Sequence, residues 1–178
     1  MKSVEIENIR SFTGALFAGT TFDPFCVTEA SFSTLFSVRI DGHVNQEYLG
    51  LEESGEAAQE TEEVEAAEEK TQEQVVKWAD IRPLCYEVVK GESLPVKFKI
   101  VLMTPPEKIP AFLEKHGINM SPDNVNALFM NIKYEGGKIT CTSGTSLKEF
   151  TKDRSLEEAW DSNVEKFAAR FTLTSADR

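Results

Sequence analysis

Apolar and polar residues alternate along several short stretches of the chain, and a period of two is typical of strands with one buried face. In chain order the strand-like stretches are 3–6, 25–32, 35–40 and 93–104; the first and last alternate, and the middle two are rich in Phe and Val. The pair Asp41-Gly42 follows the third stretch and predicts a two-residue hairpin turn, with a returning strand at 43–49. The pattern therefore indicates a chain rich in antiparallel strands.

The segment GGKITCTSGTSLKEF (136–150) combines glycines with hydroxyl side chains, a composition that phosphate-binding loops share. It lacks both the GxxxxGK[ST] order of a P-loop and the GxSxG order of a nucleophile elbow. We interpret Gly136-Gly137 as a hairpin turn between strands at 126–134 and 138–143. Gly144 is interpreted as the turn that ends the second strand.

Apolar residues recur every three or four positions in other stretches, which predicts amphipathic helices. These stretches are 8–18, 78–90, 105–117 and 155–171. Pro83 is placed in the first turn of the second helix, where the missing N–H does little harm. Ser155 and Glu158 have the spacing of a capping box at the start of the last helix.

The two halves of the chain repeat the same order of elements. Ile9-Arg10 and Ile81-Arg82 are 72 residues apart, and each pair precedes further apolar residues at matching positions. Each half is interpreted as a short strand, a helix and three strands. We predict an α+β fold of two pseudo-repeated βαβββ halves with antiparallel sheets, plus an inserted helix and a C-terminal helix. The alternative is that two unrelated αβ units share this spacing by chance.

The net charge of −11 is concentrated in residues 51–74, which contain ten Glu and one Lys and carry −9, leaving −2 for the rest. This stretch has no Pro and no aromatic residue and is interpreted as an acidic linker, flexible or transiently helical. Within a single domain (1–178), the expected parts are a first half-repeat, the linker, a second half-repeat and a C-terminal helix with its tail. Their expected ranges are 1–50, 51–74, 75–150 and 151–178.

The cysteines and the N-terminal sequence indicate the cellular compartment in which the protein is expected. Cys26, Cys85 and Cys141 are far apart and form no CxxC pair, which favours a reducing compartment and buried thiols over a zinc site. The N-terminus lacks the apolar segment of a signal peptide, and no apolar run approaches the length of a membrane span, about 20 residues. We expect a cytoplasmic protein with no membrane association, and no cofactor is predicted.

Two stretches resemble one domain of the DNA polymerase sliding clamp, which consists of two βαβββ units. They are MKSVEIENIRSFTGAL, which is similar to the opening strand and helix of a clamp domain, and ALFMNIKYEGGKITCTSGTSL, which is similar to a clamp hairpin. Other stretches, IRPLCYEVVKG and CTSGTSL among them, resemble a family of small uncharacterised proteins of anaerobic Gram-positive bacteria. That family implies no known activity.

The clamp resemblance implies a non-catalytic binding or assembly module rather than an enzyme. Its partner would be a protein, a second copy of the chain, or DNA. Clamp helices that face DNA are basic, and the basic residues of the two corresponding helices here are the candidate binding residues. They are Arg10, Lys77, Arg82 and Lys90.

The alternative function is a small metal-dependent enzyme, such as a hydrolase. Asp41, His43 and Glu47 alternate along the predicted returning strand and would share one of its faces. Carboxylate and imidazole groups are suitable ligands for a divalent cation. The competing interpretation of the same residues is a hairpin turn followed by a solvated strand face.

Overall fold

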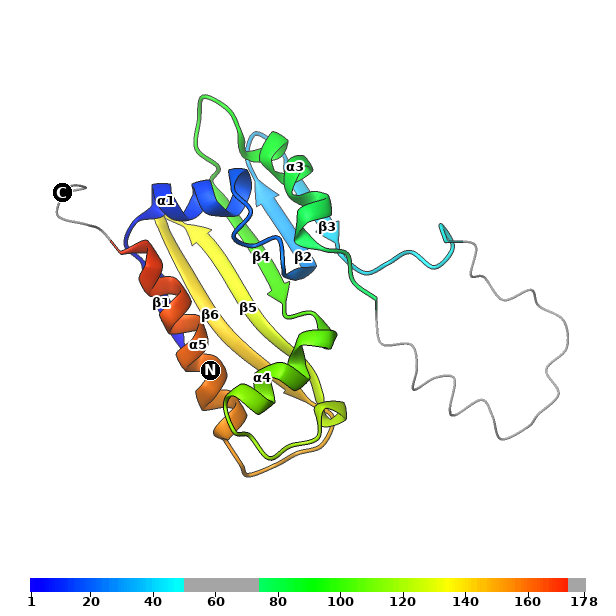
Figure 1. The fold of residues 1–178 in the computed structure, drawn as a ribbon. Coiled ribbons are helices and arrows are strands. Elements are labelled where there is room, and N and C mark those ends of the chain that lie inside the picture. Colours follow the sequence, from blue (N-terminus) through cyan, green and yellow to red (C-terminus); the bar gives the residue numbers. More distant parts are fainter. Residues whose placement is uncertain (50–73, 173–178) are drawn as a thin grey trace, which may run out of the picture.

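The computed structural model describes residues 1–49 and 74–172 (Figure 1). The strands are β1 Ser3–Ile6, β2 Cys26–Ser33, β3 Ser37–Asp41, β4 Lys97–Met103, β5 Val125–Glu135 and β6 Lys138–Leu147. The α-helices are α1 Ile9–Thr13, α3 Trp78–Val89, α4 Ile109–Lys115 and α5 Ser155–Ala168. A π-helical turn, η1 Gly14–Ala18, continues α1, and short 3-10 turns occur at η2 Pro106–Lys108, η3 Pro122–Asn124 and η4 Ala169–Phe171.

The strands of the described residues form one sheet of order β1-β6-β5-β4-β2-β3, and every neighbouring pair is antiparallel. Strands that are distant in sequence are therefore neighbours in the sheet. Strands from the first part of the chain lie at the two edges, and strands from its second part fill the middle. Neither part can therefore complete this sheet without the other.

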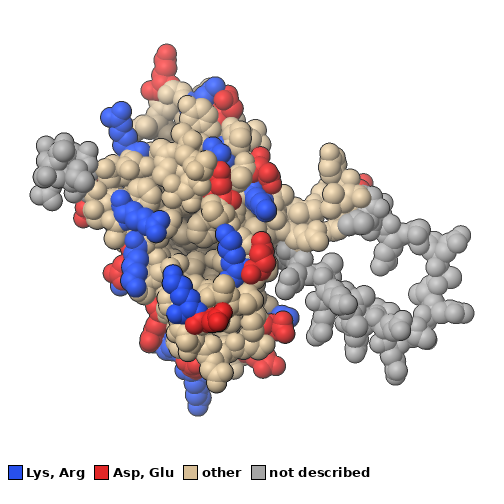
Figure 2. Space-filling model, in the orientation of Figure 1, with Lys and Arg blue, Asp and Glu red and all other residues tan. Residues whose placement is uncertain are grey.

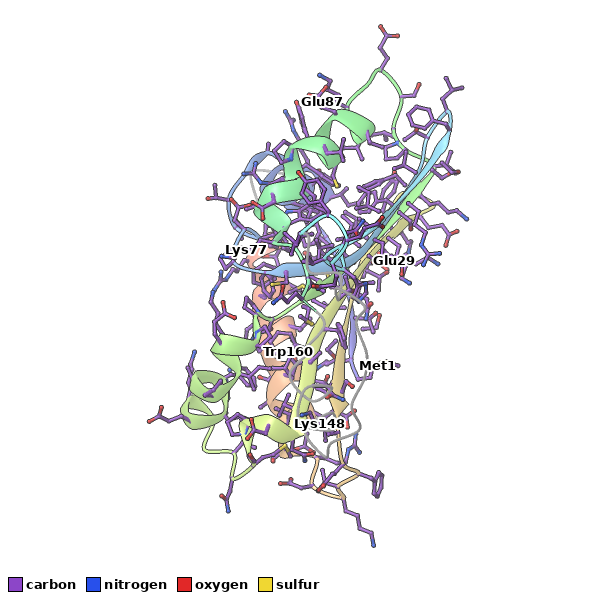
Figure 3. All side chains as sticks on the ribbon, turned by 90° about the vertical axis from the view of Figure 1, so that its right-hand side faces the viewer. Met1, Glu29, Lys77, Glu87, Lys148 and Trp160 are labelled. Carbon is purple, nitrogen blue, oxygen red and sulfur yellow. The ribbon has the colours of Figure 1, made fainter. Side chains whose placement is uncertain are left out.

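The helices cover one face of the sheet. Figure 1 shows α1 and α3 at one end, α4 toward the other end, and α5 along the edge that contains β1 and β6. In the edge-on view of Figure 3, the helices lie on one side and the labelled Glu29 lies on the other. The second face is uncovered by the described residues, and its side chains are mostly polar.

Large aromatic side chains fill the space between the helices and the sheet. The ring of Phe12 packs edge-on against Phe22 and Phe171, with centroids 5.4 and 5.0 Å apart. Trp160 is 2% exposed and donates its indole N–H to the carbonyl of Phe129 over 2.8 Å. Burial of these rings, together with aliphatic side chains of the same core, holds the helices on the sheet.

The first helix changes its winding half-way. Asn8 caps it, because its side chain accepts the N–H of Ser11 at 3.0 Å. After Thr13 the chain follows a π-helical turn, which ends where Gly19 donates its N–H to Gly14 at 2.8 Å. A π-helical turn is rare and often occurs at a functional site.

The structure confirms the predicted α+β class with an antiparallel sheet, and it forms helices in all four predicted stretches. The hairpin at 136–137 is also confirmed, since Gly136 and Gly137 have φ of 60° and 77°. The turn predicted at Gly144 is wrong. Strand β6 runs through Gly144 to Leu147 because the long strand β5 supplies pairing partners as far as Val125.

The hairpin predicted at Asp41-Gly42 and the returning strand at 43–49 are wrong. Gly42 donates its N–H to Thr28 at 2.9 Å, and a Cβ on Gly42 would lie 1.8 Å from the carbonyl oxygen of Val27. The glycine therefore permits close contact with β2 and makes no positive-φ turn. Residues 46–49 form a turn in place of a strand.

Two helix starts also differ from the prediction. Ser155 is the first residue of α5 and its hydroxyl has no hydrogen-bond partner, so the predicted capping box with Glu158 does not form. Asp153 accepts the Ser155 N–H instead, at 2.9 Å. Pro83 lies inside α3, because burial of Trp78 starts that helix five residues before the proline.

The acidic linker predicted at 51–74 lies outside the described residues except for Gln74. That residue accepts the N–H of Val44 at 2.8 Å, so the two ends of the intervening chain lie side by side. The internal repeat and the division of the domain stay predictions. Across residues 1–49 and 74–172, no helix has both the length and the hydrophobicity needed to cross a bilayer.

Candidate functional site

A groove opens between α1 with η1 on one side and α3 with the segment 90–95 on the other. Its volume is about 900 Å³, within the range of small-molecule sites. Hydrophobic, aromatic and small residues make up most of the lining. These are Ile9, Gly14, Phe17, Ala18, Tyr86, Val89, Gly91, Leu94, Pro95, Phe98, Tyr134 and Gly137.

The walls and floor of the groove are held by buried contacts. Trp78, fully buried on α3, donates its indole N–H to the carbonyl of Leu16 in η1 at 3.0 Å, which ties the two walls together. On the floor, the rings of Phe98 and Tyr134 stack with centroids 5.2 Å apart. Phe17 packs edge-on against Phe98 at 5.5 Å. The groove is thus built into the hydrophobic core.

Few polar groups reach this apolar surface. Tyr134 is 8% exposed, lines the groove, and forms no hydrogen bond through its hydroxyl with another described residue. Arg10 is exposed and has no ion-pair partner among the described residues. Lys90 lies 2.6 Å from the Glu87 carboxylate, which raises the pKa of Lys90 by accepting its hydrogen bond. The lining of this apolar groove thus includes the hydroxyl group of Tyr134 and the cations of Arg10 and Lys90.

Gly14 leaves room in the groove. Its φ of −60° and ψ of −45° are helical, and nothing lies within 4 Å of the position that a Cβ would take. Any side chain is therefore compatible with the backbone here, and the space in front of Gly14 belongs to the groove.

The structure separates the four basic candidates. Arg10 and Lys90 line the same groove. Lys77 precedes α3, so the 12-residue helix, about 18 Å long, lies between it and Lys90. Arg82 is engaged with Asp23 through two hydrogen bonds of 2.9 and 3.2 Å, and both side chains are about 20% exposed.

Figure 2 shows the helix-covered face in space-filling form. Lys and Arg side chains do not gather into one patch there; they stand among Asp and Glu side chains. Such a mixed surface lacks the single-sign field that steers a polyanion such as duplex DNA.

Of the metal candidates, the structure brings two together. The carboxylate of Asp41 accepts the His43 backbone N–H at 3.0 Å and lies 2.5 Å from His43 Nδ1. The backbone hydrogen bond is the main reason why the pKa of Asp41 is lowered. Glu47 lies in the exposed turn 46–49. Within the described ranges no three His, Cys, Asp or Glu side chains are placed to hold a metal ion, and the metal site stays a prediction.

Comparison with protein-family models found one match, over residues 15–174. The chain belongs to a family of unknown function, DUF5721. The DUF5721 match begins inside η1, so it includes α3 and strands β2 to β6 but leaves Arg10 and Gly14 outside. Comparison with curated proteins and with solved structures found no match. The sliding-clamp resemblance therefore stays a prediction.

Sequence reasoning found the cations of the groove but missed its floor and its opening. Tyr134 and Phe98 belong to strands, where their alternation with Lys133 and Lys97 indicates burial and nothing more. Gly14 stands inside a helical stretch, and such a glycine does indicate a packing or functional reason. That signal alone could have pointed to the groove.

Proposed function

We propose that this protein is a non-catalytic binding module, and that its ligand is an organic anion with an apolar body. The observation that carries the proposal is that the nearly buried Tyr134 and the exposed Arg10 line one apolar groove. The apolar body would lie on Phe98 and Phe17. The anionic group would meet Arg10 and Lys90 at the rim.

The chemistry of the lining supports binding over turnover. Among the described residues that line the groove there is no Asp, Glu, His or Cys, so Ser93, Lys90 and the two tyrosines have no carboxylate or imidazole in the lining to activate them. The hydroxyl of Thr13 donates to the carbonyl of Ile9 at 2.9 Å and so serves its own helix. A carboxylate or phosphate would satisfy the cations, and its hydrocarbon would cover the aromatic floor.

The three thiols support a cytoplasmic location for this module. Cys26, Cys85 and Cys141 are all free and buried, which suits a reducing compartment. The cytoplasm is accordingly part of the proposal.

The test is a titration of ¹⁵N-labelled protein with decanoate, and with decanol as the neutral analogue, followed by amide chemical shifts. We expect decanoate to shift the amides of Gly14, Gly91 and Leu94, and to bind more tightly than decanol. Gly14→Leu should weaken decanoate binding at least about tenfold by filling the groove. Tyr134→Phe should weaken it about fivefold through one lost hydrogen bond.

A matched pair of variants, each of which removes one positive charge, measures the electrostatic contribution to decanoate binding. Arg10→Gln should weaken decanoate binding about three- to fivefold and leave decanol binding unchanged. Lys115→Gln removes an exposed cation from α4, outside the groove, and should change neither. If Gly14→Leu binds decanoate like the wild-type protein, the groove is not the site and the proposal fails.

A further inference from the structure

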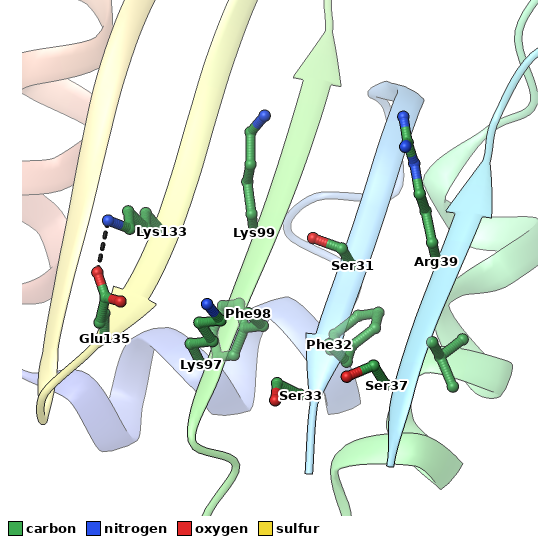
Figure 4. Close-up of a pocket in the computed structure, with 11 residues that line it drawn as sticks. Ser31, Phe32, Ser33, Ser37, Arg39, Lys97, Phe98, Lys99, Lys133 and Glu135 are labelled. Atoms are coloured by element: carbon green, nitrogen blue, oxygen red, sulfur yellow. Dashed lines mark ion pairs between the residues drawn. The ribbon is translucent and has the colours of Figure 1, made fainter.

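The open face of the sheet carries a second concave surface, independent of the groove. It is a depression of about 430 Å³ over β2, β3, β4 and β5 (Figure 4). Three serines, Ser31, Ser33 and Ser37, line it together with Phe32, Val38 and Phe98. Four cations surround them: Arg39, Lys97, Lys99 and Lys133.

The depression exists because small side chains meet in adjacent positions. Ser33 is directly opposite Ser37, and Ser31 lies two residues along the same strand on the same face. The flanking positions carry long side chains, so the face is lower over the serines than around them. The serine hydroxyls donate no hydrogen bond to other described residues. The depression is thus shallow and partly apolar, and three hydroxyls in it are able to donate hydrogen bonds.

Two of the cations are directly opposite each other on neighbouring strands. Pairing places Lys99 directly opposite Lys133 on β5, and Ser31 directly opposite both Lys99 and Arg39. Like charges in direct opposition destabilise a sheet. In the next row, the oppositely charged Lys97 and Glu135 are directly opposite each other.

Two carboxylates partly offset the four cations. Glu135 lies 2.5 Å from Lys133, and Glu29 lies 3.5 Å from Lys99 and 3.7 Å from Arg39. The depression therefore keeps an excess of two positive charges. A phosphate monoester carries about −1.5 to −2 at neutral pH and would balance that excess.

The surroundings limit the size of the anion. Asp41 is directly opposite Glu29 beyond one side of the depression. On the other side, Thr140 of β6 is opposite Lys133 and leads to Glu5 on β1. A long polyanion that ran across the strands would meet these carboxylates, whereas a small molecule would not.

We propose that this depression, which we call the serine depression, binds a small phosphate-bearing molecule. Its phosphate lies between Lys99, Lys133 and Arg39 and accepts hydrogen bonds from the serine hydroxyls. The proposal does not depend on the groove or on its ligand. Glu135 and Glu29 offset the opposed lysines only in part, and the bound anion balances the remaining positive charge.

The test uses inorganic phosphate, adenosine monophosphate and adenosine as probes in the same amide chemical-shift titration. We expect both phosphate-containing probes to shift the amides of Ser31, Ser33 and Lys99 at millimolar concentration, and adenosine not to. Tighter binding of adenosine monophosphate than of phosphate would identify an organic phosphate as the ligand class. Equal binding would identify the phosphate group alone.

Two variants distinguish an effect on phosphate binding from an effect on protein stability. Lys99→Gln should weaken phosphate binding about three- to fivefold, and it should leave the protein equally stable or more stable because it removes the opposed charges. Lys138→Gln removes a cation of the same face that pairs with Glu5 outside the depression, and it should not change phosphate binding. Equal losses in the two variants, or no shift at the serine amides of the wild-type protein, would overturn the proposal. Neither result would affect decanoate binding in the groove.

Discussion

The indole N–H of Trp78 donates a hydrogen bond to the main-chain carbonyl of Leu16, with 3.0 Å between nitrogen and oxygen. Both residues are fully buried. Leu16 lies in the last turn of a helical segment, where carbonyl groups have no partner within the helix. One side chain of α3 thus caps η1 and sets the separation of the two walls of the groove.

Replacing Trp78 by Phe should lower the free energy of unfolding by about 2–4 kcal/mol, because the Leu16 carbonyl loses its donor and the core loses volume. Urea unfolding followed by circular dichroism measures the change. Leu84→Ala is the control on the same helix, since Leu84 is 56% exposed, and it should change stability by less than about 0.5 kcal/mol. Similar losses in the two variants would contradict the role assigned to Trp78.

Two glycine-to-alanine substitutions should have effects of opposite sign. Gly42→Ala places a Cβ 1.8 Å from the Val27 carbonyl oxygen, so the backbone must shift, and stability should fall by more than about 2 kcal/mol. Gly14→Ala meets open space at a helical φ of −60° and should raise stability by about 0.5–1 kcal/mol. The midpoints of thermal unfolding of the two variants, compared with that of the wild-type protein, measure both changes in stability. A neutral Gly42→Ala would show that the contact with β2 is looser than described.

The thiols should be unreactive in the folded protein. Burial raises the pKa of Cys85 and of Cys141 to about 12 and also raises the pKa of Cys26, so little thiolate is present at pH 8. Ellman's reagent should label all three cysteines at the rate of unfolding, and at once in denaturant. Fast labelling of any one of them under native conditions would mean that it is exposed.

Asp153 should make the start of α5 sensitive to acid. The Ser155 backbone N–H donates to its carboxylate at 2.9 Å, which lowers the pKa of Asp153 below 3.8 in the folded state. Its contribution to stability is therefore present above the unfolded pKa and is lost as the pH falls through the folded pKa. The stability difference between wild type and Asp153→Ala should be constant near neutral pH and vanish in acid.

The periodicity of the sequence was enough to place most helices and strands, because each buries one apolar face. It was not enough where a tertiary contact decides the backbone. Asp41-Gly42 has the composition of a hairpin turn, yet Gly42 is needed for its approach to Val27 on a neighbouring strand. The same limit applies to Ser155, whose expected cap is replaced by Asp153.

The candidate sites were harder to predict than the helices and strands, because they are formed by segments that are far apart in sequence. Arg10 and Lys90 were identified as cations, but their shared groove follows from the packing of two helices that are far apart in sequence. The opposition of Lys99 and Lys133 follows from strand register, which no local pattern contains. Arg82 was chosen for its charge, and its partner Asp23 lies 59 residues away.

The pairing of β1 with β6 delays the completion of the sheet while the chain is being synthesised. Ile6 pairs with Ile139, so at about 5–20 residues per second roughly 7–27 s of synthesis separate the two partners. During that interval Phe12 and Phe22 emerge before the strands that will cover them. Contacts of such long sequence separation also slow folding after synthesis is complete. Among the described strands, β1 is made first and must wait for β6, which is made last, before this edge of the sheet can form.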